Sequence, residues 1–245
     1  MQAHLFAAGR RLASALTHRD FRLLWGGALG STIGTWMQKV AQAWLITTLA
    51  GANSAFFLGL DSLMGELPIL LLTLVGGVIA DRKDRRQLLL LSQYTQMASA
   101  FILATLVYFD VVRLWHILAL SAMTGVAQAF GGPAYQSLIP QLVSKENLPN
   151  AIALNSIQFN LSRIIGPLIA GAALTTFGMV ACFGLNGLSF LFVIAALFAL
   201  HVQHTPPANP RSIIDEMKGG LNYVRAEPTI IALTGVPLAP PRGTK

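Results

Sequence analysis

The stretch Gly76–Leu89, GGVIADRKDRRQLL, carries six consecutive charged side chains, from Asp81 to Arg86. On either side of these six the chain is uncharged for more than a dozen residues. Over all 245 residues, 54% are hydrophobic and 11% are charged, whereas a soluble domain has about a quarter charged. A soluble core of this length could not hide so much apolar surface. We therefore expect a membrane protein in which this stretch is a loop between two spanning helices.

The apolar runs on both sides of the loop are long enough to cross a bilayer. A hydrocarbon core of about 30 Å needs roughly 20 helical residues, and lipid requires the spanning backbone to be helical. The sequence predicts an all-α integral membrane bundle over residues 1–202, followed by a cytoplasmic linker with an amphipathic segment over residues 203–245. The six predicted spans are about 23–50, 56–80, 88–109, 114–139, 151–177 and 179–200.

The basic residues predict the orientation of this bundle, because Lys and Arg are retained on the cytoplasmic side. If both termini are cytoplasmic, the outer loops hold only Arg113. The inner segments then hold Arg10, Arg11, Arg19, Arg22, Arg82, Lys83, Arg85, Arg86 and Lys145, together with the basic residues of the tail. We expect a multi-pass protein of the bacterial inner membrane with both ends inside.

The order of residues in the hairpin is more specific than a membrane anchor requires. It reads Gly77-Val-Ile-Ala-Asp81-Arg82-Lys83-Asp84-Arg85-Arg86 and resembles the Gly-x-x-x-Asp-Arg-x-Gly-Arg-Arg loop of the major facilitator superfamily. Asp84 stands where the family has glycine, which would allow a left-handed turn. The resemblance implies two inverted three-helix repeats. It also implies a gate latch that closes against the second half of the molecule, formed by Gly77, Asp81, Arg82, Arg85 and Arg86.

The resemblance extends over residues 20–230 and points to efflux permeases similar to the enterobactin exporter. It is carried by GTWMQKVAQAWLI (34–46), GGPAYQSLIPQLVSKENLPNAIALNS (131–156) and LSRIIGPLIAG (161–171). It implies export of a small organic molecule, drug-like or siderophore-like, with protons as the coupling ion. Ser121 stands where many proton-coupled members have an arginine. Family members continue into a seventh helix, whereas residues 229–241 are broken by prolines, so the chain resembles an amino-terminal half with a truncated or frameshifted tail.

Polar residues inside the predicted spans are candidates for a substrate or proton pathway. An ionisable group at the bilayer centre costs about 2.5–3.5 kcal/mol, so each needs a partner or a water-filled cavity. Lys39 and Glu66 both lie roughly 15 Å from the outer ends of their helices, which leaves an ion pair between them open, and Asp61 is expected nearer the outer interface. Arg163, at mid-depth, either contacts an anionic substrate group or stabilises a helix interface. The full set is Thr35, Gln38, Lys39, Gln42, Asp61, Glu66, Asn160 and Arg163.

Small and aromatic residues are assigned to architecture. Glycines at four-residue spacing favour close helix packing, and Trp side chains favour the membrane interface. This spacing predicts Gly26, Gly30 and Gly34 of the first span as packing residues. Gly166, Pro167 and Gly171 of the fifth span are added because they resemble the fifth-helix Gly-Pro motif of exporters. The predicted interfacial belt consists of Trp25, Trp36, Trp44 and Trp115.

Other function classes are disfavoured. The histidines lack metal-ligand spacing, Cys182 is the only cysteine, and we expect no metal and no cofactor. Ser189 lacks the Gly-x-Ser-Gly context and the partners of an intramembrane protease, so we expect no enzyme. The basic residues form short clusters between apolar runs, which disfavours nucleic acid. The expected partners are a small molecule, protons and the lipid bilayer. A non-transporting remnant and a half-transporter acting as a homodimer remain as alternatives.

The predicted topology can be tested with reporter fusions in living cells. Fusions after Gly51, Asp110 and Gly178 should report the outside, and fusions after Arg86 and Lys145 the cytoplasm, because the basic loops stay inside. A cytoplasmic reading at any of the first three positions would contradict the topology.

Overall fold

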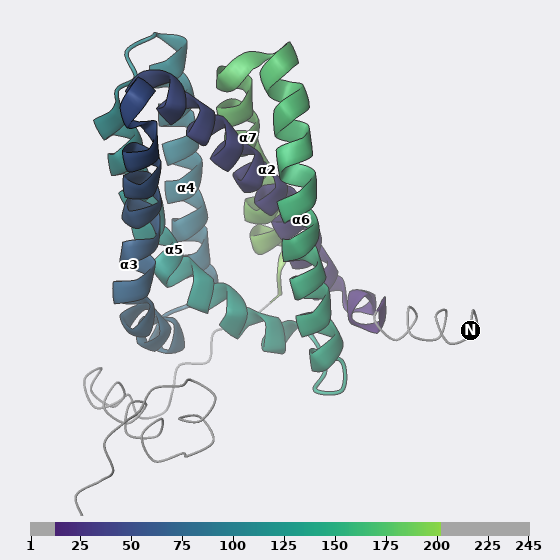
Figure 1. Ribbon diagram of the computed structural model, residues 1–245. Coiled ribbons are helices and arrows are strands. Elements are labelled where there is room, and N and C mark those ends of the chain that lie inside the picture. Colours follow the sequence, from purple (N-terminus) through teal and green to yellow (C-terminus); the bar gives the residue numbers. More distant parts are fainter. Residues whose placement is uncertain (1–12, 202–245) are drawn as a thin grey trace, which may run out of the picture. The chain divides into compact units, whose positions relative to one another are not determined.

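The structure is a computed structural model that describes residues 13–201, except for the side chains of Ala13 and Asp81. The predicted linker and amphipathic segment, residues 203–245, lie outside this range. Over the described part the chain is helical and contains no strand, so the all-α fold class is confirmed. The long helices are α2 (Arg19–Ala50), α3 (Ser54–Arg82), α4 (Arg85–Tyr108), α5 (Leu114–Leu142), α6 (Leu148–Thr176) and α7 (Gly178–Ala199), with short 3₁₀ turns η1 (Ala13–Thr17) and η2 (Gly51–Asn53) (Figure 1).

Each long helix begins and ends within four residues of a predicted span. Five helical stretches qualify by length and apolar composition as membrane spans, and the first of them, Arg19–Ala80, contains both α2 and α3. The chain turns between α2 and α3 at Gly51, whose φ of 53° is rarely adopted by other residues. The fold is thus an apolar helical bundle suited to a membrane, and the count of six spans stays a prediction.

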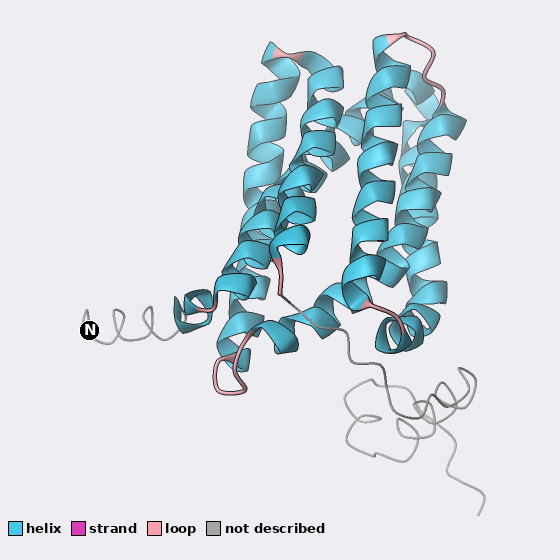
Figure 2. Ribbon diagram, turned by 180° about the vertical axis from the view of Figure 1, so that it is seen from behind, coloured by secondary structure: helices cyan, strands magenta, loops and turns pink. Residues whose placement is uncertain are grey.

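The helices pack in a pattern that repeats itself after three helices. α2 packs against α6 and α7, and in the same way α5 packs against α3 and α4. Exchanging α2 with α5, α3 with α6 and α4 with α7 therefore reproduces the contacts of the bundle, while the α4–α7 contact maps onto itself. Figures 1 and 2 show α2 crossing the bundle obliquely and the end of α5 running across its lower face. This arrangement agrees with two three-helix repeats.

Glycines allow the closest of these approaches. A side chain at Gly125 of α5 would collide with the backbone carbonyl of Gly65 in α3. At the equivalent place in the other repeat, a side chain at Gly166 of α6 would meet the Cβ of Trp36 and, at 2.9 Å, the carbonyl oxygen of Ile33. Small residues let helix backbones approach in this way, which is how helices gain packing energy in lipid.

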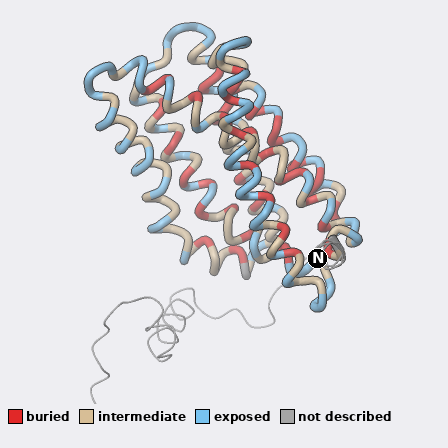
Figure 3. Tube along the Cα trace, turned by 45° about the vertical axis from the view of Figure 1, so that its right-hand side comes forward, coloured by how far each residue is buried: buried red, intermediate tan, exposed pale blue. Residues whose placement is uncertain are grey.

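The exposed surface of the bundle is strongly apolar. Leu70 is 76% exposed and Leu74 69%, both on α3, while the buried positions lie between the helices (Figure 3). A water-soluble monomer rarely exposes large contiguous apolar patches. The surface pattern is that of a protein whose solvent is hydrocarbon.

Two substitutions on α6 test the glycine contact. Gly166→Ala should lower the free energy of unfolding by about 1–3 kcal/mol, because the methyl group overpacks the α2–α6 interface. Gly171→Ala is the matched control, since nothing lies within 4 Å of the added Cβ, and it should be neutral or stabilise through helix propensity by up to about 1 kcal/mol. Thermal unfolding of the detergent-purified protein measures both. Equal unfolding temperatures would contradict the close contact.

Candidate functional site

The charged hairpin between α3 and α4 begins α4 with a side-chain cap. Asp84 is the N-cap of α4, and its carboxylate accepts a hydrogen bond from the backbone N–H of Arg86 at 2.9 Å. Its φ is −61° and its ψ 110°, so the left-handed turn considered for this position is not formed. Asp is among the best N-cap residues because its oxygen satisfies a free N–H of the first turn. The departure from glycine at Asp84 therefore gives α4 a cap.

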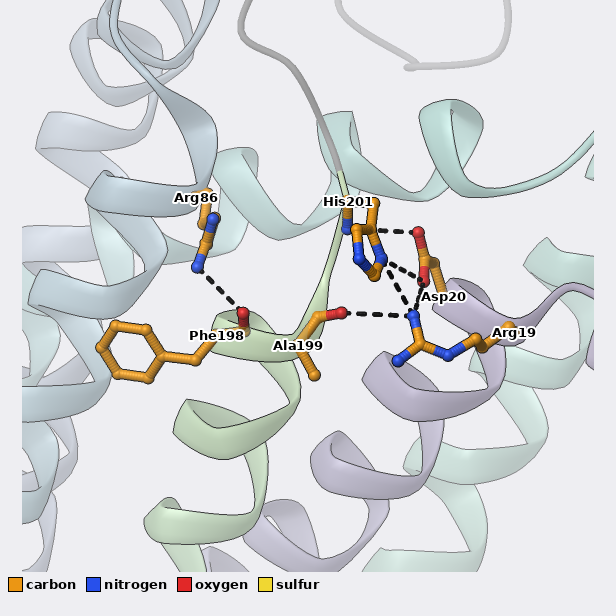
Figure 4. Close-up of polar contacts among 6 residues, drawn as sticks. All are labelled: Arg19, Asp20, Arg86, Phe198, Ala199 and His201. Carbon is orange, nitrogen blue, oxygen red and sulfur yellow. Dashed lines mark hydrogen bonds and ion pairs between the residues drawn. The ribbon is translucent and has the colours of Figure 1, made fainter.

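Two arginines of the hairpin bind backbone carbonyls near the ends of other helices. Arg85 donates to the carbonyl of Ala80 at 3.2 Å and to that of Ser137 in α5 at 3.1 Å. Arg86 donates to the carbonyl of Phe198 at the end of α7 at 3.2 Å, with its guanidinium 5.8 Å from the Phe198 ring (Figure 4). Carbonyls at helix C-termini lack helical partners and attract cations. The hairpin is thereby fastened to α5 and α7.

A second polar cluster fastens the start of α2 to the end of α7 on the same side of the bundle (Figure 4). Arg19 lies 3.2 Å from the Asp20 carboxylate, 2.9 Å from Nδ1 of His201 and 3.4 Å from the carbonyl of Ala199. The backbone N–H of His201 donates to Asp20 at 3.3 Å. These contacts, like those of Arg85 and Arg86, bind elements within this bundle. The side chain of Asp81 is not among those described, and the gate latch stays a prediction.

A partly buried carboxylate cluster joins α2, α3 and α5. The side-chain amide nitrogen of Gln42 donates hydrogen bonds to both carboxylate oxygens of Asp61, at 2.9 Å each. It also donates to the hydroxyl oxygen of Ser121 at 2.9 Å. Ser121 in turn donates to Asp61 at 2.5 Å. No Lys, Arg or His of the described range lies within ion-pairing distance of Asp61. The Asp61 carboxylate is thus held by neutral donors alone, and we call Gln42, Asp61 and Ser121 the carboxylate cluster.

Two cations share one aromatic ring between α2 and α6. Nζ of Lys39 lies 5.0 Å from the ring centroid of Trp36, and the guanidinium carbon of Arg163 lies 5.5 Å from it. The ring of Phe159 meets that of Trp36 edge to face, with centroids 6.0 Å apart. Lys39 and Arg163 are exposed on the bundle. We call Trp36, Lys39, Phe159 and Arg163 the cation–aromatic cluster.

The remaining predicted pathway residues are held by local or neighbouring groups. Gln38 accepts a hydrogen bond from the amide of Asn186 in α7 at 2.7 Å. Thr35 donates to the carbonyl of Ser31 and Asn160 to that of Ser156, each one helical turn back. Glu66 is exposed and forms no ion pair with Lys39 or with any other side chain in residues 13–201. The Lys39–Glu66 pair that the spacing left open is not formed.

The sequence model of the family described as transmembrane secretion effector matches residues 12–234, which is most of the chain. The chain belongs to this family of the major facilitator superfamily. The transmembrane character that this description names agrees with the apolar helical bundle described above. The resemblance carried by the charged hairpin is thereby confirmed at the level of the superfamily.

The curated relatives that this chain matches include proteins named as transporters. The staphyloferrin A transporter of Staphylococcus aureus is 27% identical over 194 residues, 79% of this chain and 48% of that protein. An enterobactin exporter of Shigella boydii is 28% identical over 215 residues, 85% of this chain and 48% of that protein. An uncharacterised transporter of the same superfamily from Bacillus subtilis is 26% identical over 213 residues, 84% and 49% respectively. The chain spans about half the length of the curated relatives it matches.

The position of Trp36 differs from the one that the interfacial belt predicts. Trp36 lies seventeen residues after the start of α2 and fourteen before its end. Its neighbours follow helical spacing, with Lys39 three residues on and Phe159 four residues before Arg163. Residues at these spacings share one helix face, so this pattern could have indicated the cluster.

The predicted packing glycines differ in their surroundings. Gly34 faces Asn186 and Ser189 of α7, and Gly30 faces the side chain of Phe192, 3.3 Å from where its Cβ would lie. Gly26, Gly77 and Gly171 have no neighbouring atom within 4 Å of that position. Among residues 13–201, no group of three His, Cys, Asp or Glu side chains is placed to hold a metal ion.

The cap at the hairpin can be tested by three substitutions at one position. Asp84→Ala should lower the free energy of unfolding by about 1 kcal/mol, because it removes the acceptor for the Arg86 N–H. Asp84→Asn keeps an acceptor, and Asp84→Gly costs only a few tenths of a kcal/mol, so both should lie close to the unsubstituted protein. Thermal unfolding in detergent measures the three variants. An alanine variant as stable as the asparagine variant would contradict the capping role.

Proposed function

We propose that this chain belongs to an efflux permease of the bacterial inner membrane that exports a small, siderophore-like organic molecule and uses the proton gradient. The observation that carries the proposal is the carboxylate cluster, an acid with neutral donors inside an apolar bundle. The relatives support the substrate class, because one is named as a staphyloferrin A transporter and another as an enterobactin exporter. The proposal includes no enzymatic step, and the distribution of basic residues supports a cytoplasmic position for both termini.

Asp61 is the proposed proton site. An ionisable side chain within a spanning helix needs hydrogen-bond partners or water, and Asp61 has such partners. The charged form accepts hydrogen bonds from Gln42 and Ser121, which lie on α2 and α5. Adding a proton gives one carboxyl oxygen a hydrogen to donate while it can still accept, so the set of donors and acceptors among Asp61, Gln42 and Ser121 changes. In this proposal, protonation is thereby coupled to the contact of α3 with α2 and α5.

The hairpin arginines have a supporting role in the proposal. Rocking of one bundle against another requires each bundle to move as a unit. Arg85 and Arg86 link the hairpin to α5 and α7, which stiffens the cytoplasmic ends of the helices. The proposed latch of Gly77, Asp81, Arg82, Arg85 and Arg86 would then transmit closure to a rigid bundle.

Proton coupling is tested in vesicles that contain the 245-residue chain and a lumenal pH-sensitive dye. Addition of enterobactin should produce proton movement together with movement of enterobactin. Asp61→Asn should reduce the proton movement, because the amide cannot take up a proton. The expected reduction is about tenfold or more, which corresponds to a free-energy change of about 1.4 kcal/mol. Asp110→Asn is the matched control, since Asp110 is exposed in the turn after α4.

Two outcomes would count against this proposal. Enterobactin that moves at the same rate in the Asp61→Asn variant, with the same proton movement, would remove Asp61 from the proton pathway. Vesicles in which neither enterobactin nor protons move would contradict permease activity by this chain.

A further inference from the structure

We propose that the cation–aromatic cluster binds an organic anion with a planar, aromatic or carboxylate-bearing group and discriminates against cations. The inference rests on the proposed export function, because it names the substrate class of the same permease. Its starting point is that Lys39 and Arg163 lie within 5.0 and 5.5 Å of the same Trp36 ring centroid. Two positive groups gathered on one ring repel each other unless negative charge accompanies them.

Both cations lie near the middle of their helices, on the exposed surface of the bundle. Lys39 is eleven residues before the end of α2 at Ala50, and Arg163 is thirteen residues before the end of α6 at Thr176. At about 1.5 Å per residue these separations are roughly 16 and 20 Å, near the middle of a bilayer. A cation at this depth costs at least about 2.5 kcal/mol unless it is paired or faces a water-filled cavity. Two such residues mark a ligand pathway.

Within the described bundle, nothing neutralises them. Neither Lys39 nor Arg163 forms an ion pair or a hydrogen bond with any described side chain. Asp61, the carboxylate on the neighbouring α3, is already occupied by Gln42 and Ser121, and Glu66 pairs with neither cation. The cation–π interaction with the Trp36 ring stabilises each cation by only about 0.5–2 kcal/mol. An anionic ligand is the missing counter-charge.

The cluster has the shape and chemistry for a planar anion. A guanidinium presents a flat fork of donors that matches a carboxylate, and a Lys ammonium adds a second, mobile positive charge. The Trp36 and Phe159 rings stand at 72° to each other, so they offer one ring face and one ring edge for stacking. A ligand that combines an acidic group with a planar ring can use all four side chains at once.

The position of Arg163 is set by the tight α2–α6 contact. Gly166, three residues after Arg163 and therefore on the same side of α6, packs against the Cβ of Trp36 and the backbone of Ile33. Gln158, buried one turn before Ser162, donates to the hydroxyl of Thr32 on α2 at 2.9 Å. These two contacts on either side of Arg163 hold α6 in register with Trp36. The cluster is therefore formed before any ligand arrives.

The test uses two fluorescent dyes with the same xanthene ring system and opposite charge. Carboxyfluorescein is a polyanion, and rhodamine 123 is a cation. Each dye is titrated against the 245-residue chain in nanodiscs of uncharged lipid, and binding is followed by fluorescence anisotropy. Carboxyfluorescein should bind saturably, and rhodamine 123 should not.

Substitutions assign the binding to the cluster. Arg163→Gln and Lys39→Gln should each raise the dissociation constant for carboxyfluorescein by about tenfold or more, since hydrogen bonds to charged groups contribute about 1.5–3 kcal/mol. Arg163→Lys keeps the charge and should recover part of the affinity. Lys145→Gln is the control, because Lys145 is an exposed cation in the loop before α6 and its removal lowers the net charge equally. Thermal unfolding of each variant shows that it is folded.

The outcomes separate this inference from the proposed function. Carboxyfluorescein binding that is saturable, lost in Arg163→Gln and kept in Lys145→Gln supports the anion site even when the vesicles show no proton movement. Absence of saturable binding to the unsubstituted chain overturns the inference. Equal binding of both dyes, or equal loss in Arg163→Gln and Lys145→Gln, overturns it too and leaves proton-coupled export untouched.

Discussion

Hydrocarbon offers no hydrogen bonds, so every polar group in the helices has to find its partner within the protein. Most of them do so in this bundle. Gln158 binds Thr32 across the α2–α6 contact, and Asn186 binds Gln38 across the α2–α7 contact. Many Ser and Thr hydroxyls donate to the carbonyl one turn back in their own helix, as Thr35 does. The helix packing therefore has to bring polar side chains together as well as bury apolar ones.

Some charged groups do not meet that constraint. Asp61 meets it through neutral donors from two other helices, whereas Lys39, Glu66 and Arg163 have no hydrogen-bonding or charged partner in the described part of the chain. In a bilayer such groups are costly, and a purely structural bundle would avoid them. Their positions are the reason for the proposals of a proton site and of an anion site made above.

The limits of the helices were predictable from the sequence, while the partners of the polar residues were not. Runs of apolar residues predict where a helix must cross lipid, and each helix end lies within four residues of its predicted place. The hydrogen bonds among Gln42, Asp61 and Ser121 depend on how α3 packs against α2 and α5. No local sequence pattern specifies this packing. Trp36 is a different case. It lies near the middle of the predicted span 23–50 as well as of α2, so its central position could be read from the sequence, whereas the ring's contact with Arg163 of α6 could not.

The exchange symmetry of the contacts has a consequence for how the chain is made. α3 packs mainly on α5, and α6 packs mainly on α2, so each repeat contributes its second helix to the other repeat. During synthesis, α2, α3 and α4 enter the membrane before α5 exists, and the tight face of α3 at Gly65 has no partner until Gly125 arrives. The first repeat is thus an unfinished intermediate whose polar groups depend on lipid headgroups, water or an insertion factor. Insertion and folding of this chain are separate events in time.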